Sequence, residues 1–277
     1  MSTLAAPIDH QTFTFLSQFI RDKSAIVLEP SKTYLIESRL MPVVREYELE
    51  NLAELVDNLK RPGTRDLAQK VVDAMTTNET SFYRDIHPFD AMKTHIILEL
   101  IKRREKERSL HIWSNACSSG QEVYSIAMLL REYFPQLAGW RIRLIASDLS
   151  SDILKKAQEG IFNQTEVNRG LPMQLLLKYF TKQGLNWQIK DEVRAGIEFQ
   201  PVNLIERWPT LPSMDIVFLR NVLIYFDPAT KTNVLKKARA QMKPDGYLFL
   251  GGAETTMNLD VALCRETIGK ATCYRPS

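Results

Sequence analysis

The sequence has few cysteines, no excess of either charge and no long apolar run, and each shortage excludes a class of protein. Three cysteines without metal-ligand spacing predict free thiols in a reducing cytoplasm and no metal centre. The 36 basic and 33 acidic residues leave a formal charge of +3, which does not favour a nucleic-acid partner. No apolar run approaches the roughly 20 residues of a membrane span. The opening residues, MSTLAAPIDHQ, also lack the basic start and apolar core of a signal peptide.

The first quarter of the chain has helical periodicity and no strand pattern. Apolar side chains recur at three- and four-residue spacing, as in Phe13, Leu16 and Ile20. Pro42 is expected to kink or end the second of these helices. The predicted organisation is a helical domain over residues 1–75, a linker contributing to the site over 76–90, and an α/β domain over 91–277.

The chain is organised around residues 111–124, HIWSNACSSGQEVY. An apolar run gives way to small residues, and apolar positions then recur at helical spacing, which predicts a strand, a tight turn and a helix. In an open α/β sheet such a turn lies at the carboxyl end of a strand, where cofactors bind. Only Gly120 of a dinucleotide fingerprint is present, so an ordinary βα turn explains this stretch alone about as well.

A second predicted strand, residues 141–147, ends at Asp148. An acidic residue about 25 residues after the first turn suits the hydroxyl pair of a ribose. Glu122, at the start of the predicted helix, and Asp148 could therefore flank one nucleoside.

The remaining pattern completes an α/β domain. Residues 243–246 (KPDG) predict a turn, and 187–189 with 192–194 predict a short antiparallel β-insert near 181–196. Further strands are predicted at 197–202, 214–219, 247–250 and 271–274, the last at an edge of the sheet.

A polar segment, residues 76–85 (TTNETSFYRD), lies between two helical stretches. Its Thr and Asn side chains can cap a helix, with Arg84 in solvent. The segment is also rich in hydroxyl and amide groups, and interdomain clefts are common ligand sites, so it is a candidate binding segment.

These stretches together resemble a known family. The order strand, small turn, helix, strand, Asp resembles the class I S-adenosylmethionine-dependent methyltransferases. TTNETSFYRD, WSNACSSGQEVYSIAM, ASDLSSDILKKAQEGIF, PVNL and FLRNVLIYFDP together resemble the chemotaxis receptor glutamate O-methyltransferases, the CheR family. The resemblance covers nearly the whole chain. It implies a Rossmann-like sheet with helices on both faces and an enzyme that methylates glutamate carboxylates of chemoreceptors.

The resemblance also implies a site for S-adenosylmethionine and its product, S-adenosylhomocysteine. Arg84 and Tyr225 match the family residues nearest the transferred methyl, which implies catalytic roles. The turn reads Ser-Gly-Gln-Glu where the family mostly has Thr-Gly-Glu-Glu, so Gln121 is not expected to be a ligand. The implied cofactor-binding residues are Asn78, Thr80, Arg84, Glu122, Asp148, Asn203, Leu204, Arg220 and Asn221.

The partners implied by the resemblance are the cytoplasmic methylation helices of chemoreceptors. The family meets its receptor through a basic helix, which Arg39 and Arg45 fit although Pro42 interrupts it. Some members grip a receptor's C-terminal pentapeptide with the β-insert. The short turn at 182–185 predicts that this chain, expected to be a monomer, does not need that tether. The alternatives are a class I methyltransferase with another substrate, such as RNA or a small molecule, and a non-catalytic S-adenosylmethionine-binding module.

Overall fold

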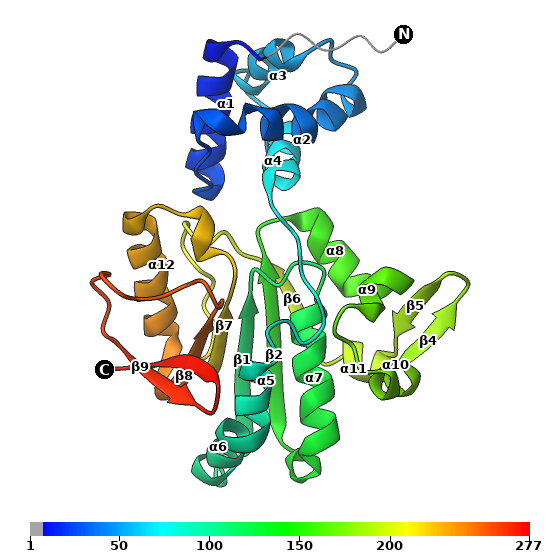
Figure 1. Ribbon diagram of the computed structural model, residues 1–277, viewed down its shortest axis with the longest axis vertical. Helices are drawn as coiled ribbons and strands as arrows, with labels where there is room; N and C mark the ends of the chain where they lie inside the picture. Colours follow the sequence, from blue (N-terminus) through cyan, green and yellow to red (C-terminus); the bar gives the residue numbers. More distant parts are fainter. Residues whose placement is uncertain (1–7) are drawn as a thin grey trace. The chain divides into compact units, whose positions relative to one another are not determined.

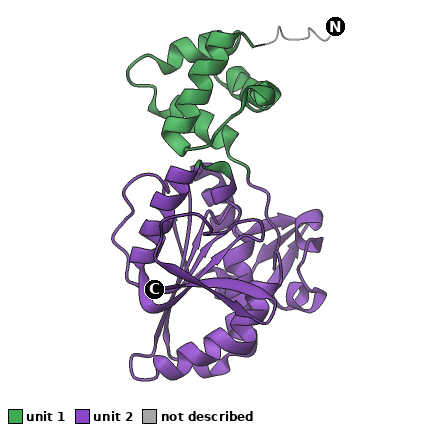
Figure 2. Ribbon diagram, turned by 60° about the vertical axis from the view of Figure 1, so that its left-hand side comes forward, with its two compact units in different colours: residues 1–77, 225–227 green, residues 78–224, 228–277 purple. Residues whose placement is uncertain are grey.

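The computed structural model describes residues 8–277, so the first seven residues of the stretch considered as a signal peptide lie outside it. The chain forms two compact units, residues 1–77 with 225–227 and residues 78–224 with 228–277 (Figure 2). We call them the helical unit and the sheet unit. No helix within residues 8–277 combines the length and apolar character that a bilayer crossing requires.

Four α-helices surround the apolar core of the helical unit (Figure 1). Asp9 and Asn51 cap two of them, each accepting a hydrogen bond from a backbone N–H in the first turn. The helices are α1 (His10–Ser24), α2 (Thr33–Glu46), α3 (Leu52–Leu59) and α4 (Arg65–Met75), with a 3-10 turn η1 (Pro30–Lys32) before α2.

Helix α2 continues through Pro42 and does not end there. A proline inside a helix removes one backbone hydrogen bond and clashes with the preceding turn. Leu40, Val43 and Val44, on either side of it, are buried in the unit's core. Burial of these side chains, each worth about 1.5–3 kcal/mol, offsets the local loss and keeps the helix continuous.

A seven-stranded sheet forms the centre of the sheet unit, in the order β6-β2-β1-β7-β8-β10-β9. The strands are parallel from β6 to β8, and β10 is antiparallel to both of its neighbours. This confirms the predicted Rossmann-like class. The strands are β1 (Ser109–Asn115), β2 (Arg141–Asp148), β6 (Ile197–Pro201), β7 (Met214–Leu219), β8 (Met242–Leu250), β9 (Leu263–Ile268) and β10 (Ala271–Pro276).

Helices pack against this sheet. The sequences of its central strands are continuous apolar runs, because helices cover the sheet and bury both of its faces. Met214 to Leu219 of β7, for example, are all buried. The helical elements are α5 (His87–Ala91), a π-helical segment η2 (Met92–Ile96), α6 (Ile97–Arg103), α7 (Gln121–Tyr133), η3 (Pro135–Leu137), α8 (Ser151–Glu159), η4 (Leu223–Tyr225) and α12 (Pro228–Gln241).

A separate three-stranded antiparallel sheet forms the β-insert, in the order β3-β5-β4. Gln183 pairs with Asn186, so β4 and β5 are joined by a two-residue turn, Gly184-Leu185. The predicted strand at 192–194 is wrong: these residues lie in a helix, whose first turn carries two carboxylates that its dipole favours. The elements are β3 (Ile161–Asn163), α9 (Gln164–Asn168), α10 (Met173–Tyr179), β4 (Phe180–Gln183), β5 (Asn186–Ile189) and α11 (Asp191–Arg194).

Two predictions about the end of the sheet are wrong. β10 is not an edge strand, because β9 pairs along its outer side. β9 has no buried residue, so it lacks the apolar alternation that identifies strands. Residues 243–246 lie within β8 at an irregularity, where the register passes from Met214–Met242 directly to Ile216–Tyr247. The turn residues therefore bulge out of a strand without ending it.

Candidate functional site

The carboxyl ends of the parallel strands meet at one edge of the sheet. Asn115 at the end of β1 is in register with Ser147 of β2 and with Leu219 of β7, and Leu219 is in register with Leu250 of β8. Asp148 and the loops that begin at residues 116, 220 and 251 consequently leave the sheet together. In open α/β sheets this edge is where ligands bind.

The turn after β1, residues 116–120, is held by hydrogen bonds that its own backbone N–H groups donate to β2. Ser118 N donates to Asp148 Oδ2 at 2.9 Å, and Cys117 N donates to Ser147 O at 2.9 Å. Ala116, Ser118 and Gly120 have positive φ angles of 50°, 52° and 92°. Small side chains make this winding possible and leave the backbone of the turn approachable. We call these five residues the β1 turn.

The β1 turn also binds the polar segment predicted to contribute to the site. Ser118 Oγ donates to the backbone oxygen of Asn78 at 2.8 Å. The Asp148 carboxylate is 7% exposed, and its Oδ1 accepts from Ser150 N at 3.1 Å. The sheet unit thus brings Asn78, the β1 turn and Asp148 together.

A buried ion network lies at the end of β7. Arg220 Nη1 donates to Glu122 Oε2 and Arg220 Nη2 donates to Asp85 Oδ2, each at 2.8 Å. Nη2 also donates to the backbone oxygen of Arg84 at 2.9 Å. The other oxygen of Glu122 accepts from Ser114 Oγ at 2.7 Å. Both oxygens of Glu122 therefore have protein partners, which the sequence did not predict.

The segment around Arg84 is held in an unusual backbone conformation. Tyr83 and Asp85 have φ angles of 49° and 52°, so a left-handed residue lies on each side of Arg84. Tyr83 N donates to Ser125 Oγ at 3.0 Å, and Arg84 Nη1 donates to the backbone oxygen of Glu79 at 2.8 Å. The Arg220 contact to Arg84 O fixes the same segment from β7.

Two buried nitrogen atoms at this edge have no hydrogen-bond partner among the described residues. They are Asn115 Nδ2, at the end of β1, and Arg220 Nε, directly after β7. An unsatisfied buried donor costs roughly 1–3 kcal/mol, so a polar ligand that accepts from it gains binding energy. Both donors, together with the Asp148 carboxylate, fit a polar nucleoside-containing cofactor such as S-adenosylmethionine.

The remaining predicted residues are located by backbone contacts or by their positions in the chain. Val202 N donates to the backbone oxygen of Asp148 at 3.0 Å, which brings the end of β6, with Asn203 and Leu204, beside β2. Thr80 is half-buried, and Asn221 directly follows Arg220. Tyr225 is grouped with the helical unit, where its backbone oxygen accepts from Val27 N at 3.1 Å.

Cys117 lies in the β1 turn but does not provide a nucleophile. Burial raises the pKa of its thiol well above the ordinary value, and the charges of Asp148 and Glu122 raise it further. The thiol therefore stays protonated at neutral pH. Its contribution is that of a small apolar side chain.

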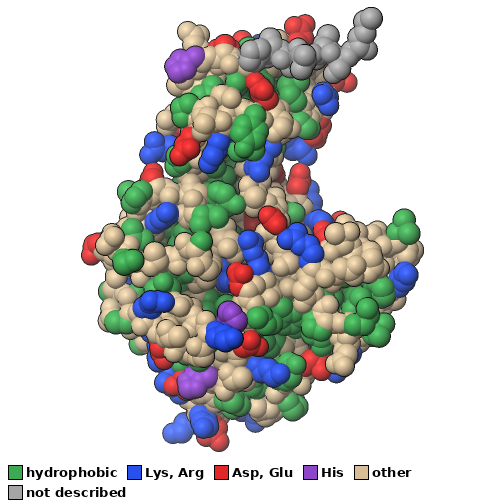
Figure 3. Space-filling view, in the orientation of Figure 1, with side chains coloured by type: hydrophobic (Ala, Val, Ile, Leu, Met, Phe, Trp, Pro, Cys, Tyr) green, Lys and Arg blue, Asp and Glu red, His purple; other side chains and the backbone are tan. Residues whose placement is uncertain are grey.

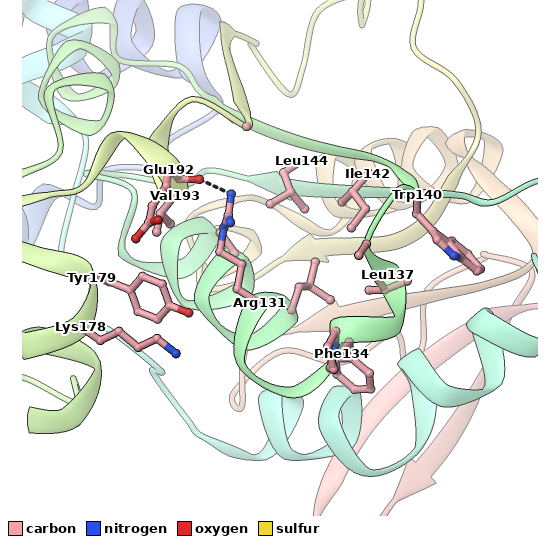
Figure 4. Close-up of a pocket in the computed structure, with 15 residues that line it drawn as sticks. Arg131, Phe134, Leu137, Trp140, Ile142, Leu144, Lys178, Tyr179, Glu192 and Val193 are labelled. Carbon is pink, nitrogen blue, oxygen red and sulfur yellow. Dashed lines mark hydrogen bonds between the residues drawn. The ribbon is translucent and has the colours of Figure 1, made fainter.

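A second hollow, of about 500 Å³, lies near the opposite end of β2 (Figure 4). Leu144, Ile142 and Val193 line it, and Arg131 donates to the backbone oxygen of Glu192 at its side. The cation of Lys178, which also lines the hollow, pairs with Glu132 outside the lining at 2.5 Å. We assign this hollow no part in the site. On the face shown in Figure 3, basic and acidic side chains are interspersed without a field of one sign.

Two family models match the chain. The model described as "CheR methyltransferase, SAM binding domain" matches residues 78–268, and "CheR methyltransferase, all-alpha domain" matches residues 11–76. The chain belongs to the CheR methyltransferase family. It is an S-adenosylmethionine-dependent protein-glutamate methyltransferase of chemotaxis, and the predicted family and cofactor are confirmed.

Curated relatives of this CheR chain match over most of its length. "Chemotaxis protein methyltransferase 1" of Pseudomonas aeruginosa is 39% identical over 253 residues, covering 89% of this chain and 91% of the relative. The protein of the same name from Vibrio cholerae is 37% identical over 258 residues, covering 92% and 93%. "Chemotaxis protein methyltransferase" of Escherichia coli is 32% identical over 254 residues, covering 90% and 85%.

Three residues that were not predicted from the sequence contact predicted site residues. Ser118 and Asp85 each bond a predicted residue, and Glu254 bonds the backbone of Asn221. Asp85 directly follows Arg84, and a carboxylate beside a candidate arginine is a signal that could have identified it. Glu254 lies 33 residues from Asn221, and nothing in the local sequence pairs them.

Proposed function

We propose that the edge formed by β1, β2, β6 and β7 holds S-adenosylmethionine. The observation that carries this proposal is the Asp148 carboxylate, fixed against the β1 turn by Ser118 N at 2.9 Å. A carboxylate in this place would bind the ribose hydroxyl pair. The proposed binding residues are Asn78, Thr80, Arg84, Glu122, Asp148, Asn203, Leu204, Arg220 and Asn221.

The cofactor supplies a methyl group on a sulfonium, and the protein holds this group and the acceptor carboxylate in line with each other. A glutamate has a pKa near ~4.3 and is already the nucleophile at neutral pH, so no general base is required. The reaction brings a cation and an anion together and neutralises both, so a pocket that excludes water favours it. Orientation of the acceptor carboxylate supplies much of the remaining effect.

Arg84 and Tyr225 are proposed to orient the acceptor. The Arg84 guanidinium can hold a carboxylate through two parallel hydrogen bonds. That contact weakens as the carboxylate loses charge, so it places the substrate and does not selectively stabilise the transition state. The Tyr225 hydroxyl can donate one hydrogen bond to the carboxylate. Because the hydroxyl is neutral, this bond positions the carboxylate without strongly stabilising its negative charge.

The proposed substrates are glutamate side chains on the cytoplasmic helices of chemoreceptors, methylated during adaptation. The match of both parts of the chain to CheR models supports this substrate. The test is incubation with labelled methyl donor and a panel of receptor cytoplasmic domains, counting label released by mild alkali. Base-labile label in a receptor supports the proposal. Label that resists alkali would indicate another methylation substrate, and binding without turnover would indicate a non-catalytic module.

We propose that this enzyme, as a monomer, recognises the methylation helices without a pentapeptide tether. The β4–β5 turn has only two residues, and β4 itself has four, which leaves little room for an added peptide strand. Titration with a peptide ending in Trp-Glu-Glu-Phe should show no micromolar binding. Receptors with and without such a tail should be methylated at equal rates; loss of activity on tail removal would contradict the proposal.

Of the two arginines expected in the receptor-binding helix, Arg39 is bound within the helical unit. Arg39 Nη1 donates to the backbone oxygens of Met75 at 2.7 Å and Thr76 at 3.2 Å, and Nη2 donates to Thr77 Oγ1 at 3.0 Å. Its guanidinium is therefore engaged at the end of α4. We propose Arg45 as the receptor-facing arginine of α2.

A further inference from the structure

The loop after β8 carries a carboxylate that ties two strand ends together. Glu254 Oε2 accepts from Asn221 N at 2.8 Å and from Gly251 N at 2.6 Å. Glu254 Oε1 accepts from Ile224 N at 3.2 Å. Hydrogen bonds from backbone N–H groups to a charged carboxylate are shorter and stronger than neutral ones. One side chain thus holds both ends of the segment 221–224.

The two loops approach each other more closely than side chains would permit. A Cβ at Gly251 would lie 2.6 Å from Asn221 Nδ2, 2.8 Å from Asn221 N and 2.8 Å from Glu254 Oε2. Asn221 has a φ angle of 57°, a left-handed conformation that asparagine adopts more readily than most residues. Close approach and an unfavourable backbone angle at one position indicate a conformation that its surroundings impose.

The segment that Glu254 holds is the one on which the proposed site depends. Arg220, directly before it, binds Glu122, Asp85 and the backbone of Arg84. Tyr225 directly follows Ile224 in the chain. The hydrogen bonds of Glu254 go to backbone N–H groups of Asn221, Ile224 and Gly251, so its effect on the site passes through the backbone of these loops.

We propose that Glu254 is a positioning residue for methyl transfer: its carboxylate fixes the loop after β7 in the conformation that presents Arg220 and Asn221. This inference rests on the proposed function. Removing the carboxylate frees three backbone N–H groups and lets Asn221 leave its left-handed conformation. The folded protein then populates loop conformations in which the methyl donor and the acceptor are misaligned.

The test compares Glu254→Gln and Glu254→Ala with the wild-type chain on a receptor cytoplasmic domain. Glutamine keeps the shape but has one accepting oxygen, so kcat should fall roughly tenfold, and the alanine variant should lose roughly 100-fold. The KM for the receptor should change by less than about threefold, because Glu254 does not contact the acceptor. Rates are measured per folded protein, well below each variant's Tm.

Asp260→Asn is the matched control, because Asp260 follows in the same connection, is exposed, and pairs with Lys236 at 2.7 Å. Its kcat should equal that of the wild type. Gly251→Ala should reproduce the loss without changing charge, since its methyl group enters the contact with Asn221. A lower Tm with unchanged kcat in Glu254→Gln would overturn the inference and leave a structural role. A wild-type chain that methylates no receptor would instead refute the proposed function.

Discussion

The β1 turn and the loop after β7 leave neighbouring strands of one sheet but are held in different ways. The β1 turn is fixed by its own backbone N–H groups, which donate to the Asp148 carboxylate and to the backbone oxygen of Ser147. The loop after β7 is fixed by a buried ion network, in which its Arg220 binds Glu122 and Asp85, and by the Glu254 carboxylate. Substitutions at the first should mainly change ligand affinity, whereas substitutions at the second should change stability and catalytic geometry.

The largest expected effect is a loss of stability when the ion network of the loop after β7 is broken. Arg220→Met leaves the carboxylate of Glu122, whose side chain is 11% exposed, without its cation. Breaking such a buried pair costs about 3–5 kcal/mol, so the free energy of unfolding should fall by that amount in urea titrations. Arg220→Lys keeps the positive charge but not the planar guanidinium that binds two carboxylates, so its free energy of unfolding should fall by less. Wild-type stability in Arg220→Met would contradict this account.

A large effect on turnover with little effect on stability is expected from Arg84→Ala. Its guanidinium donates to Glu79 O within its own loop, so no apolar core depends on it. Loss of acceptor orientation should lower kcat roughly 100-fold with the Tm unchanged. Arg169→Ala is a matched control, because Arg169 bonds the Glu79 carboxylate at 2.8 Å. Wild-type turnover in Arg84→Ala would refute the orienting role.

At the β1 turn, the expected effect is on the affinity for the cofactor and its product. Asp148→Ala removes a charged acceptor, and S-adenosylhomocysteine should bind ~1.5–3 kcal/mol more weakly in calorimetric titration. Asp152→Ala, on the helix that follows, should bind normally. Unchanged affinity in Asp148→Ala would remove Asp148 from the cofactor site.

The smallest effect concerns thiol reactivity. Burial raises the pKa of Cys273 to about 12 and raises the pKa of Cys117 well above its ordinary value. A raised pKa lowers the thiolate fraction, to on the order of 10⁻⁴ for Cys273 at pH 8. Iodoacetamide at that pH should label the exposed Cys264 first, as measured by peptide mass spectrometry. Early labelling of Cys117 would show that the β1 turn opens.

The sequence predicted the parts of the fold that periodicity and strand ends determine. The strand ending at Asp148 and the helix after Gly120 were placed within a residue or two. β9 was missed because none of its residues is buried. Pro42 was expected to kink or end the second helix, because the local sequence does not report the packing around it.

The candidate site was predicted from the sequence only where its residues lie near strand ends or the β1 turn. Asp148 ends β2 and contacts the β1 turn, and Glu122 lies two residues after that turn. The Arg220 network and the Glu254 contact join segments 98, 135 and 33 residues apart, and no local pattern links such positions. Pairing of charges from distant segments depends on the tertiary arrangement, so these partners could be identified only from the structure.

One chain of hydrogen bonds beside the β1 turn has an optical consequence. The indole N–H of Trp113, a fully buried side chain, donates to Ser147 Oγ at 2.9 Å, and Ser147 Oγ donates to Asn115 Oδ1 at 3.1 Å. The Trp208 ring lies edge-on at 5.0 Å. A ligand that engages the Asn115 amide alters the dipoles around this indole. The proposed cofactor site therefore lies beside an intrinsic fluorophore, and we expect a change in its emission when S-adenosylhomocysteine is added.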